Sequence, residues 1–311
     1  MHIYNSWEGL KSKYDNIVVG LGNFDGVHIG HQKLIHELVV LAKKVQGTPV
    51  VFTFHPHPLA VLKPESCPPH LLSQECKQDI FTRLGVEVLL TIPFNLKLAG
   101  LSPEDFVRKV LCEEIGVRGV VVGYNYTFGH KAQGTPKLLN DLSKTYGFAL
   151  RVIHPVTVDG QTVSSTAIRN LIKIGDVSGA AKLLGYYPFM SGEVVSGEKR
   201  GRKLGFPTAN LEIDTEILVP ANGVYAAKID HRDDTYLGLV NIGVKPTFLG
   251  KKRNIEVHLL DFCQDLYGEQ IKVNFTRRIR EEKKFASPTE LIEQIEADVH
   301  AARVEWLKTG E

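Results

Sequence analysis

Two different patterns of apolar residues divide this chain into two parts and constrain its fold more than any other feature. From Asn16 onward, short runs rich in valine and isoleucine alternate with stretches whose apolar residues recur at helical spacing. The runs are "NIVVGLG", "TPVVFTF", "VEVLLTI", "RGVVVG" and "ALRVIHPV". Continuous apolar strands that alternate with helices form parallel sheets with helices on both faces. The first part is therefore predicted to be a Rossmann-like parallel α/β domain.

The pattern changes after Leu184. Beyond the joint "GYYPF" come short strand-like pieces broken by Gly, Pro, Asn and Asp, such as "GVYAAKID", "YLGLVNIGV" and "IKVNFTRRI". Such a series indicates a small antiparallel β-barrel or sandwich. The length of 311 residues fits two domains, at roughly 150 residues each. We predict a first domain over residues 1–186 and a second domain, a small antiparallel β-barrel, over residues 187–311.

A terminal helix is predicted to close the second domain. Ser287 as N-cap, Pro288 at the first helical position and Glu290 three residues after the cap form a capping-box start. Apolar residues then recur on one face, which we expect to dock on the barrel. They are Leu291, Ile295, Val299, Ala302 and Trp306.

Composition excludes several classes of protein. The net charge is only +2, so overall charge gives no support to nucleic-acid binding. The four cysteines are scattered without zinc or disulfide spacing. The sequence shows no signal peptide and no apolar run long enough for a membrane span. We expect a cytoplasmic protein without a membrane or nucleic-acid partner, and no feature indicates an oligomer.

The stretch "GNFDGVHIGHQKLI", residues 22–35, joins the first strand to the first long helix. A glycine-rich loop that opens a helix offers unpaired N–H groups and the positive end of the helix dipole to an anion. His28 and His31 are three residues apart, so both imidazoles can lie beside one phosphate. They can then stabilise charge that develops on this phosphate. From these residues alone, histidines that only cap or pack the helix remain an equal alternative.

A second stretch, "SSTAIRNLI", shows a similar pattern at residues 164–172. Ser164 or Ser165 can cap a helix whose beginning carries Thr166 and Arg169. Hydroxyl groups and a guanidinium at a helix start suit phosphate, because arginine binds it with two parallel hydrogen bonds. An ordinary capped helix with a solvated arginine is the alternative here.

The second half contains a basic, glycine-rich stretch, "GEVVSGEKRGRKLGFPTANL". Cationic side chains on such a loop can cover a polyphosphate. Thr208 and Asn210 are two residues apart, so an extended chain places their oxygen atoms on the same side. Oxygen ligands of this kind suit Mg²⁺. A basic surface hairpin remains the alternative.

"GNFDGVHIGH" resembles the GxFDGxHxGH signature of the HxGH nucleotidylyltransferase superfamily, which pairs it with an element like "SSTAIR" that holds the β- and γ-phosphates. The resemblance implies an adenylyl or cytidylyl transfer in which His28, His31 and Arg169 are catalytic. It further implies ATP contacts from Gly22, Asn23, Phe24, Asp25, Gly26, His28, His31, Asn125, Ser164, Ser165, Thr166 and Arg169. "TFHPHP" and "GYNYTFGHKAQG" resemble segments that line flavin and adenine sites in bacterial FAD synthetases. They suggest flavin contacts from His57, Pro58, Asn125 and Phe128.

"GFPTAN" resembles the PTAN motif of riboflavin kinases, and "NIGVKPTF" and "NIEVHLLDF" continue the resemblance. It implies that Glu256 is the catalytic base and that Thr208 and Asn210 bind Mg²⁺ with ATP. ATP contacts in this domain are expected from Gly197, Arg202, Lys203, Gly205, Pro207, Thr208 and Asn210.

Over nearly its whole length the chain resembles the bacterial bifunctional riboflavin kinase/FAD synthetases. The implied activity phosphorylates riboflavin with ATP to FMN and then adenylylates FMN with a second ATP to FAD and pyrophosphate. Its substrates and cofactors are riboflavin, FMN, ATP and Mg²⁺. The alternatives are an HxGH nucleotidylyltransferase for another substrate and a flavin-binding regulator that has lost catalysis.

Overall fold

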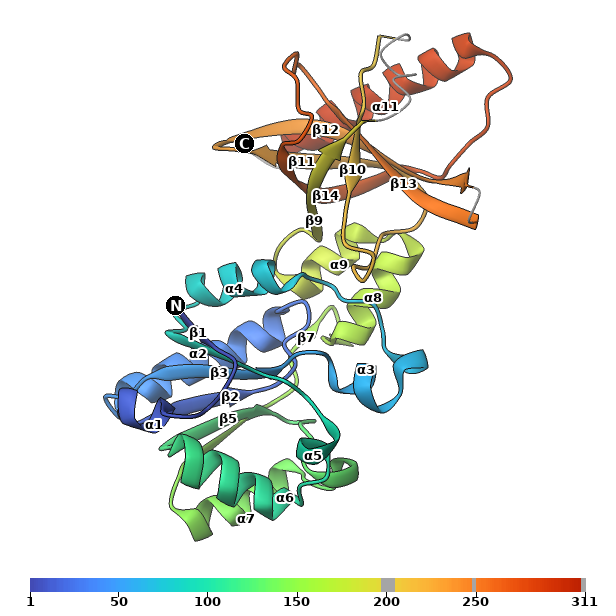
Figure 1. Ribbon diagram of the computed structural model, residues 1–311. Coiled ribbons are helices and arrows are strands. Elements are labelled where there is room, and N and C mark those ends of the chain that lie inside the picture. Colours follow the sequence, from blue (N-terminus) through green and yellow to red (C-terminus); the bar gives the residue numbers. More distant parts are fainter. Residues whose placement is uncertain (197–204, 248–249, 309–311) are drawn as a thin grey trace. The chain divides into compact units, whose positions relative to one another are not determined.

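The computed structural model describes residues 1–196, 205–247 and 250–308, apart from the side chains of residues 245–247, 250–252 and 308. The chain divides into two compact units, Met1–Ser164 and Ser165–Glu311 (Figure 1). The sequence predicts a division at residues 186/187. The compact units divide earlier, because the helices α8 (Ser165–Ile174) and α9 (Val177–Leu184) pack with each other and α9 packs on β14 (Gln270–Arg280) of the barrel. Each unit is described by itself below.

The first unit is a six-stranded parallel sheet in the order β1-β4-β3-β2-β5-β6. Its strands are β1 (His2–Tyr4), β2 (Val18–Leu21), β3 (Pro49–Phe54), β4 (Val88–Ile92), β5 (Gly119–Gly123) and β6 (Ala149–Ile153), followed by a small hairpin of β7 (Thr157–Val158) and β8 (Gln161–Thr162). Its longer helices are α2 (Ile29–Lys44), α4 (Gln74–Arg83), the π-helix η2 (Phe106–Ile115) and α7 (Pro136–Tyr146). The short helical segments are α1 (Leu10–Lys13), α3 (Pro58–Leu62), η1 (Pro64–Ser66), α5 (Leu96–Ala99), α6 (Pro103–Asp105) and η3 (His130–Ala132).

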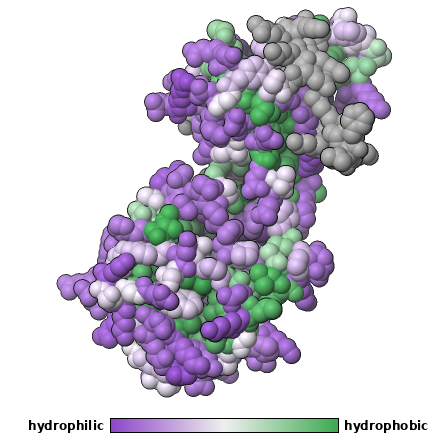
Figure 2. Space-filling model, viewed as in Figure 1, coloured by the Kyte–Doolittle hydropathy of each residue, from purple (hydrophilic) through white to green (hydrophobic). Residues whose placement is uncertain are grey.

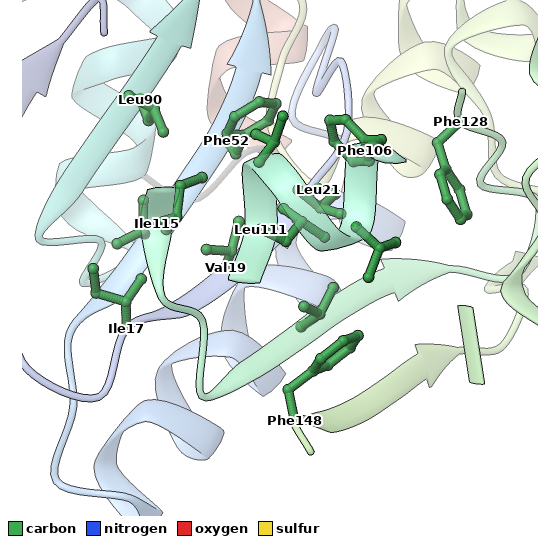
Figure 3. Close-up of a cluster of buried hydrophobic side chains, with 14 of the residues drawn as sticks. Ile17, Val19, Leu21, Phe52, Leu90, Phe106, Leu111, Ile115, Phe128 and Phe148 are labelled. Carbon is green, nitrogen blue, oxygen red and sulfur yellow. The ribbon is translucent and has the colours of Figure 1, made fainter. Parts of the chain in front are cut away.

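Side-chain alternation along the strands explains why helices cover both faces of this sheet. In β2, Val19 and Leu21 point into a core that also contains Phe106 and Leu111 of η2 (Figure 3). Gly20 lies between them and faces the other way, toward α2, where a Cβ atom would be 3.1 Å from a methyl carbon of Leu38. The prediction of a parallel α/β domain covered on both faces is therefore confirmed.

The second unit begins with two helices and continues as a closed antiparallel barrel in the order β10-β13-β12-β11-β14-β9. Its elements are α8 (Ser165–Ile174), α9 (Val177–Leu184), β9 (Phe189–Val195), β10 (Ala209–Glu212), β11 (Gly223–His231), β12 (Asp234–Thr247), β13 (Gly250–Leu259), β14 (Gln270–Arg280) and α11 (Pro288–Lys308). Alternate residues of the strands, such as Val240, Ile255 and Val257, fill the barrel interior. The predicted small barrel is confirmed.

The terminal helix α11 begins as its sequence predicts. Ser287 Oγ accepts a hydrogen bond from Glu290 N (3.2 Å), and Glu290 Oε2 accepts one from Ala286 N (3.2 Å). Val299 and Ala302 of the expected face pack against barrel residues. An ion pair between the buried Asp298 and the partly exposed Arg280 (2.9 Å) also joins the helix to β14, and no local sequence pattern predicts it.

Apolar side chains are gathered inside each unit. Hydrophilic residues cover most of the face drawn in Figure 2, and hydrophobic residues appear there in small groups. None of the helices within the described residues combines the length and the apolar character that crossing a membrane requires.

Candidate active sites

The first site lies at the carboxyl ends of three neighbouring strands, β3, β2 and β5. The glycine-rich loop follows β2, His57 follows β3 and Asn125 follows β5. From β2 the chain continues to β3 and β4 on one side of β2 in the sheet, and then crosses to β5 and β6 on the other side. The strand order therefore reverses between β2 and β5. Open parallel sheets bind ligands at such a reversal, outside the carboxyl ends of the strands.

His28 and His31 form a stacked pair at the start of α2. Their ring centroids are 3.6 Å apart and their planes differ by 12°. His28 is the N-cap of the helix, and its Nδ1 accepts a hydrogen bond from His31 N (3.2 Å). The two imidazoles therefore lie side by side at the positive end of a long helix, where an anion is stabilised.

Both histidines are held neutral. Burial lowers the pKa of His28 to about 4, and only 6% of its surface is exposed. Burial, followed by the charges of His28 and Lys77, lowers the pKa of His31 well below its usual range. Because His28 Nδ1 accepts a hydrogen bond from the backbone N–H of His31, the proton of the neutral ring lies on Nε2. His28 is therefore a hydrogen-bond donor at its Nε2 atom.

The loop around this pair is supported by side chains that point inward. Phe24 packs edge-on against His31 (5.3 Å between centroids) and Phe81 (5.7 Å). Asp25 is buried, and its Oδ1 accepts a hydrogen bond from Leu71 N (3.0 Å). Both residues were predicted to contact ATP. With these side chains turned into the protein, only their backbone remains for such a contact.

Three glycines of the loop lie where the geometry leaves little room for a larger residue. Gly26 has φ +78°, a left-handed conformation that glycine adopts without strain. A Cβ atom at Gly30 would lie 3.2 Å from His28 Cε1 and from His28 Nδ1. A larger residue at position 30 would push against the His28 ring. Gly22 similarly faces the Phe24 ring, at 3.2 Å from a Cβ position.

Three of the predicted flavin residues lie on the loops of the first site, and the fourth lies in the hydrophobic core. His57 is the N-cap of α3, and a hydrogen bond joins its Nε2 to the Asn23 amide of the glycine-rich loop (3.2 Å). Pro58 begins α3, and Asn125 is exposed beyond β5. Phe128, in contrast, is only 6% exposed and belongs to the hydrophobic core. Little of its ring is left for a ligand.

The "SSTAIR" residues lie where the chain passes into the second unit. The helix α8 begins at Ser165, so Ser164 directly precedes it and Thr166 lies in its first turn. Arg169 is one turn further along and is 7% exposed. The helical context that the sequence predicted is present. The role of these residues in the first site stays a prediction.

The second site is a row of polar side chains on the barrel wall. Asn210 of β10 and Glu256 of β13 are directly paired across the two strands. Ile255 and Val257 point into the barrel interior, so Glu256 points away from it, as the sequence alternation predicted. Asn254 Nδ2 donates a hydrogen bond to Glu256 Oε1 (2.8 Å).

Thr208 and Asn210 lie on the same side of the chain. Ala209 between them packs against the barrel core, so in an extended segment its two neighbours face outward with Glu256. Gly205, which starts the segment, has φ +89°. Gly197, Arg202 and Lys203, predicted to contact ATP, lie outside the described residues.

The structure adds two residues to this row that the sequence analysis did not assign. Asn241 of β12 is paired with Glu256 on the side opposite Asn210. His258 lies two residues after Glu256 on β13, and its Nδ1–H donates a hydrogen bond to the Pro207 carbonyl (2.7 Å). The period-2 alternation of "NIEVHLL" already places His258 on the same face as Glu256, so this signal was available.

The barrel site offers oxygen atoms of a kind that suits a divalent cation. No cluster of three or more histidine, cysteine, aspartate or glutamate residues able to hold a metal occurs in residues 1–196, 205–247 and 250–308. The Thr208 hydroxyl and the Asn210 amide oxygen face the same side as the Glu256 carboxylate. Mg²⁺ takes such oxygen ligands together with water and nucleotide phosphates.

Two protein families match two successive parts of the chain. A family described as FAD synthetase matches residues 10–167, and a family described as riboflavin kinase matches residues 184–306. The first match contains the histidine pair and the second contains the Asn210–Glu256 pair.

Whole-chain relatives carry both activities in one name. "Bifunctional riboflavin kinase/FMN adenylyltransferase" of Bacillus subtilis is 40% identical, covering 97% of this chain and 96% of the relative. The protein of that name in Escherichia coli K12 is 35% identical, covering 93% and 92%. A solved structure titled "Crystal Structure of Macrolide-efflux Protein from Streptococcus pneumoniae" is 33% identical, with a TM-score of 0.89 and coverage of 97% and 98%. We take only the similarity of fold from this structure.

Proposed function

The chain belongs to the bifunctional riboflavin kinase/FMN adenylyltransferases, and on this premise we propose which residues perform each reaction. The enzyme phosphorylates riboflavin to FMN and adenylylates FMN to FAD. We assign the first reaction to the barrel and the second to the histidine pair. The functional division at residues 186/187 is part of this proposal.

In the kinase reaction, Glu256 accepts the proton of the riboflavin 5′-hydroxyl as its oxygen attacks the γ-phosphate of ATP. The bond from the γ-phosphorus to the bridging oxygen breaks, and ADP leaves. A positioned carboxylate contributes about 10²–10⁴-fold in such a step. The cross-strand pairing of Asn210 with Glu256 supports this role, since it places Asn210, a proposed contact of the nucleotide, next to the base. Gly197, Arg202, Lys203, Gly205 and Pro207 complete the proposed ATP site.

Mg²⁺ is the proposed cofactor of the barrel site, held by Thr208 and Asn210. When bound, it neutralises phosphate charge during phosphoryl transfer. The two side chains orient it through oxygen atoms that face the same side as Glu256. Their spacing on either side of Ala209, which packs against the barrel core, supports the assignment.

In the adenylyl transfer, an oxygen of the FMN phosphate attacks the α-phosphate of a second ATP, and pyrophosphate leaves. A phosphate monoester dianion is a competent nucleophile, so this step needs charge stabilisation and alignment more than it needs a base. His28 donates from Nε2 toward the α-phosphate, and His31 does the same. Arg169, with Ser164, Ser165 and Thr166, is proposed to bind the β- and γ-phosphates through its bidentate guanidinium.

The remaining assignments place the two ligands of the first site. Gly22, Asn23 and Gly26 bring backbone close to ATP, together with Asn125. His57 and Pro58 lie on the flavin side, and the hydrogen bond between His57 and Asn23 supports a shared border between the two ligands. We also propose that the enzyme works in the cytoplasm without a nucleic-acid or membrane partner.

One observation carries the proposal most strongly. A stacked, neutral histidine pair at a helix start lies in one unit, while the paired Asn210 and Glu256 lie in the other. To test it, the protein is incubated with riboflavin, ATP and Mg²⁺, and riboflavin, FMN and FAD are separated by chromatography. We expect FMN to appear first and FAD to follow. Flavin that binds without any turnover of ATP would instead support a regulator.

A further inference from the structure

A side-chain hydrogen bond holds the carboxylate of Glu256 from within its own strand. Asn254 Nδ2 donates to Glu256 Oε1 at 2.8 Å, and the bond is partly buried. Ile255, between the two residues, packs into the barrel core, so Asn254 and Glu256 lie on the same outer face of β13. The alternation of the strand therefore places an amide donor beside the proposed base.

Strand pairing alone does not fix the position of a glutamate carboxylate. The register of the barrel sets the backbone of Glu256 between Asn210 of β10 and Asn241 of β12. The side chain beyond the backbone has several rotatable bonds, and each rotamer puts the carboxylate in a different place. A general base must lie within hydrogen-bond reach of the proton that it accepts, at about 2.6–3.2 Å. One rotamer therefore has to be selected, and the hydrogen bond from Asn254 selects it.

The backbone that carries this donor is itself held in place. Asn254 is paired with Gly243 of β12 in the barrel ladder. The preceding residue, Arg253, donates hydrogen bonds to the Val219 carbonyl (2.8 Å) and to Asn222 Oδ1 (3.2 Å). The Asn254 side chain therefore starts from a fixed point on the strand.

A second carboxylate lies over the residue opposite Asn254. Gly243 has no side chain, and a Cβ atom there would be 2.8 Å from Glu282 Oε1. An amide at position 254 adds no negative charge to this face of the strands, whereas an aspartate of the same shape would add one next to Glu256. Asn254→Asp therefore replaces an attraction by a repulsion without a change of size.

We infer that Asn254 is a positioning residue of the kinase reaction, which holds the Glu256 carboxylate in the orientation that accepts the proton of the riboflavin 5′-hydroxyl. Asn254 keeps its own amide protons throughout. The inference rests on the proposed role of Glu256 as the base. A hydrogen bond that only stabilised β13 would matter equally whether or not residue 256 could accept a proton. Removing the base therefore separates the two explanations.

The test uses the full-length protein with Asn254→Leu, which keeps the size of the side chain but removes the donor. We expect kcat for FMN formation to fall by about 10–100-fold, the effect of losing a hydrogen bond to a carboxylate. The KM values for riboflavin and ATP should stay within about twofold, and FAD formation from added FMN should not change. Asn254→Asp should lower kcat at least as far, and it serves as the second variant if Asn254→Leu does not fold. The control Asn140→Ala, which replaces an exposed asparagine of α7, should change neither activity.

The same substitution is then made together with Glu256→Gln, where no base is left to position. Adding Asn254→Leu to Glu256→Gln should lower FMN formation by no more than about twofold further. An equal loss with and without Glu256→Gln would overturn the inference, because Asn254 would then act without the base. A normal kcat in the folded Asn254→Leu or Asn254→Asp variant would overturn it as well. If Glu256→Gln itself kept normal kinase activity, the proposed base would be refuted and the inference with it.

Discussion

The two sites of this enzyme are built by different means. In the first unit, the residues of the site lie on separate loops after β2, β3 and β5, and packing between distant segments brings them together. In the second unit, Asn210 and Glu256 are neighbours because two strands pair in one register. The first site depends on buried, neutral side chains such as His28, while Glu256 remains partly exposed.

This difference matches the chemistry of the two reactions. Adenylyl transfer from a phosphate nucleophile needs hydrogen-bond donors at fixed positions, and burial keeps the imidazoles neutral and oriented. Phosphoryl transfer to a hydroxyl needs a base that accepts a proton, and the Glu256 carboxylate is the group proposed for this role. Each unit therefore supplies the environment that its own reaction requires.

The largest effect is expected from the double variant His28→Ala/His31→Ala. Loss of one preorganised donor typically costs about 10²–10³-fold in rate, and loss of both should abolish FAD formation. Riboflavin phosphorylation should continue at its normal rate, because the barrel site is untouched. The two products are measured separately in one assay. If the double variant still made FAD at the normal rate, the histidine assignment would be wrong.

Glu256→Gln should produce the reverse pattern. Removing the base while keeping the side-chain shape should lower FMN formation by about 10²–10⁴-fold. FAD formation from added FMN should be unchanged. Asn210→Ala is expected to act in the same direction, through weaker binding of the nucleotide. A folded variant that lost both activities together would show that the two sites are coupled.

Acid should destabilise the first unit through its neutral histidines. In the folded chain, burial lowers the pKa of His28 from 6.5 to about 4. Protonating His28 therefore costs roughly 3 kcal/mol more in the folded chain than in the unfolded chain. The unfolded chain takes up this proton once the pH falls below about 6.5. The free energy of unfolding is therefore highest, as far as His28 determines it, above pH 6.5 and declines from there toward pH 4.

Tryptophan fluorescence can report this effect for the first unit alone. Trp7 packs on the core of that unit, and replacing the other tryptophan by Trp306→Phe leaves Trp7 as the only probe. Denaturant titrations at pH 7, 6 and 5 should show a falling midpoint, and His28→Asn should flatten this dependence. An equally steep dependence in His28→Asn would assign the acid sensitivity to other groups.

The smallest effect is expected from His258→Phe. The variant keeps an aromatic ring but removes the N–H that donates to the Pro207 carbonyl. A single hydrogen bond contributes about 0.5–1.5 kcal/mol, so the KM for ATP in the kinase reaction should rise by about 2–12-fold. FAD formation from FMN should not change, and neither activity should change in His300→Phe, which replaces an exposed histidine of α11. An unaffected KM would show that this hydrogen bond does not position the Pro207–Asn210 segment.

Much of the fold could be predicted because its patterns are local. The continuous apolar runs became the parallel strands, and the alternation around Glu256 placed that side chain outside the barrel interior. The capping box of α11 involves residues only a few positions apart. Motif spacing likewise located His28 and His31 at one helix start.

The remaining features depend on contacts between distant segments. The inward turn of Asp25 is fixed by Leu71 N, and the burial of Phe128 depends on packing around it. Lys77 gave one local signal, since it falls on the same helical face as the buried Ile80 and Phe81. The extent of its burial, however, is set by the packing of the segments around it.

On the proposed assignment, one chain carries two independent sites. The most direct measurement mixes two variants, His28→Ala/His31→Ala and Glu256→Gln, with riboflavin, ATP and Mg²⁺. Alone, the first variant should make no FAD, and the second should make FAD only at its lowered rate of FMN formation. The mixture should make FAD, because FMN released by the first variant is adenylylated by the second. If each variant kept its own remaining activity but the mixture made no FAD, the claim of two independent sites would be contradicted.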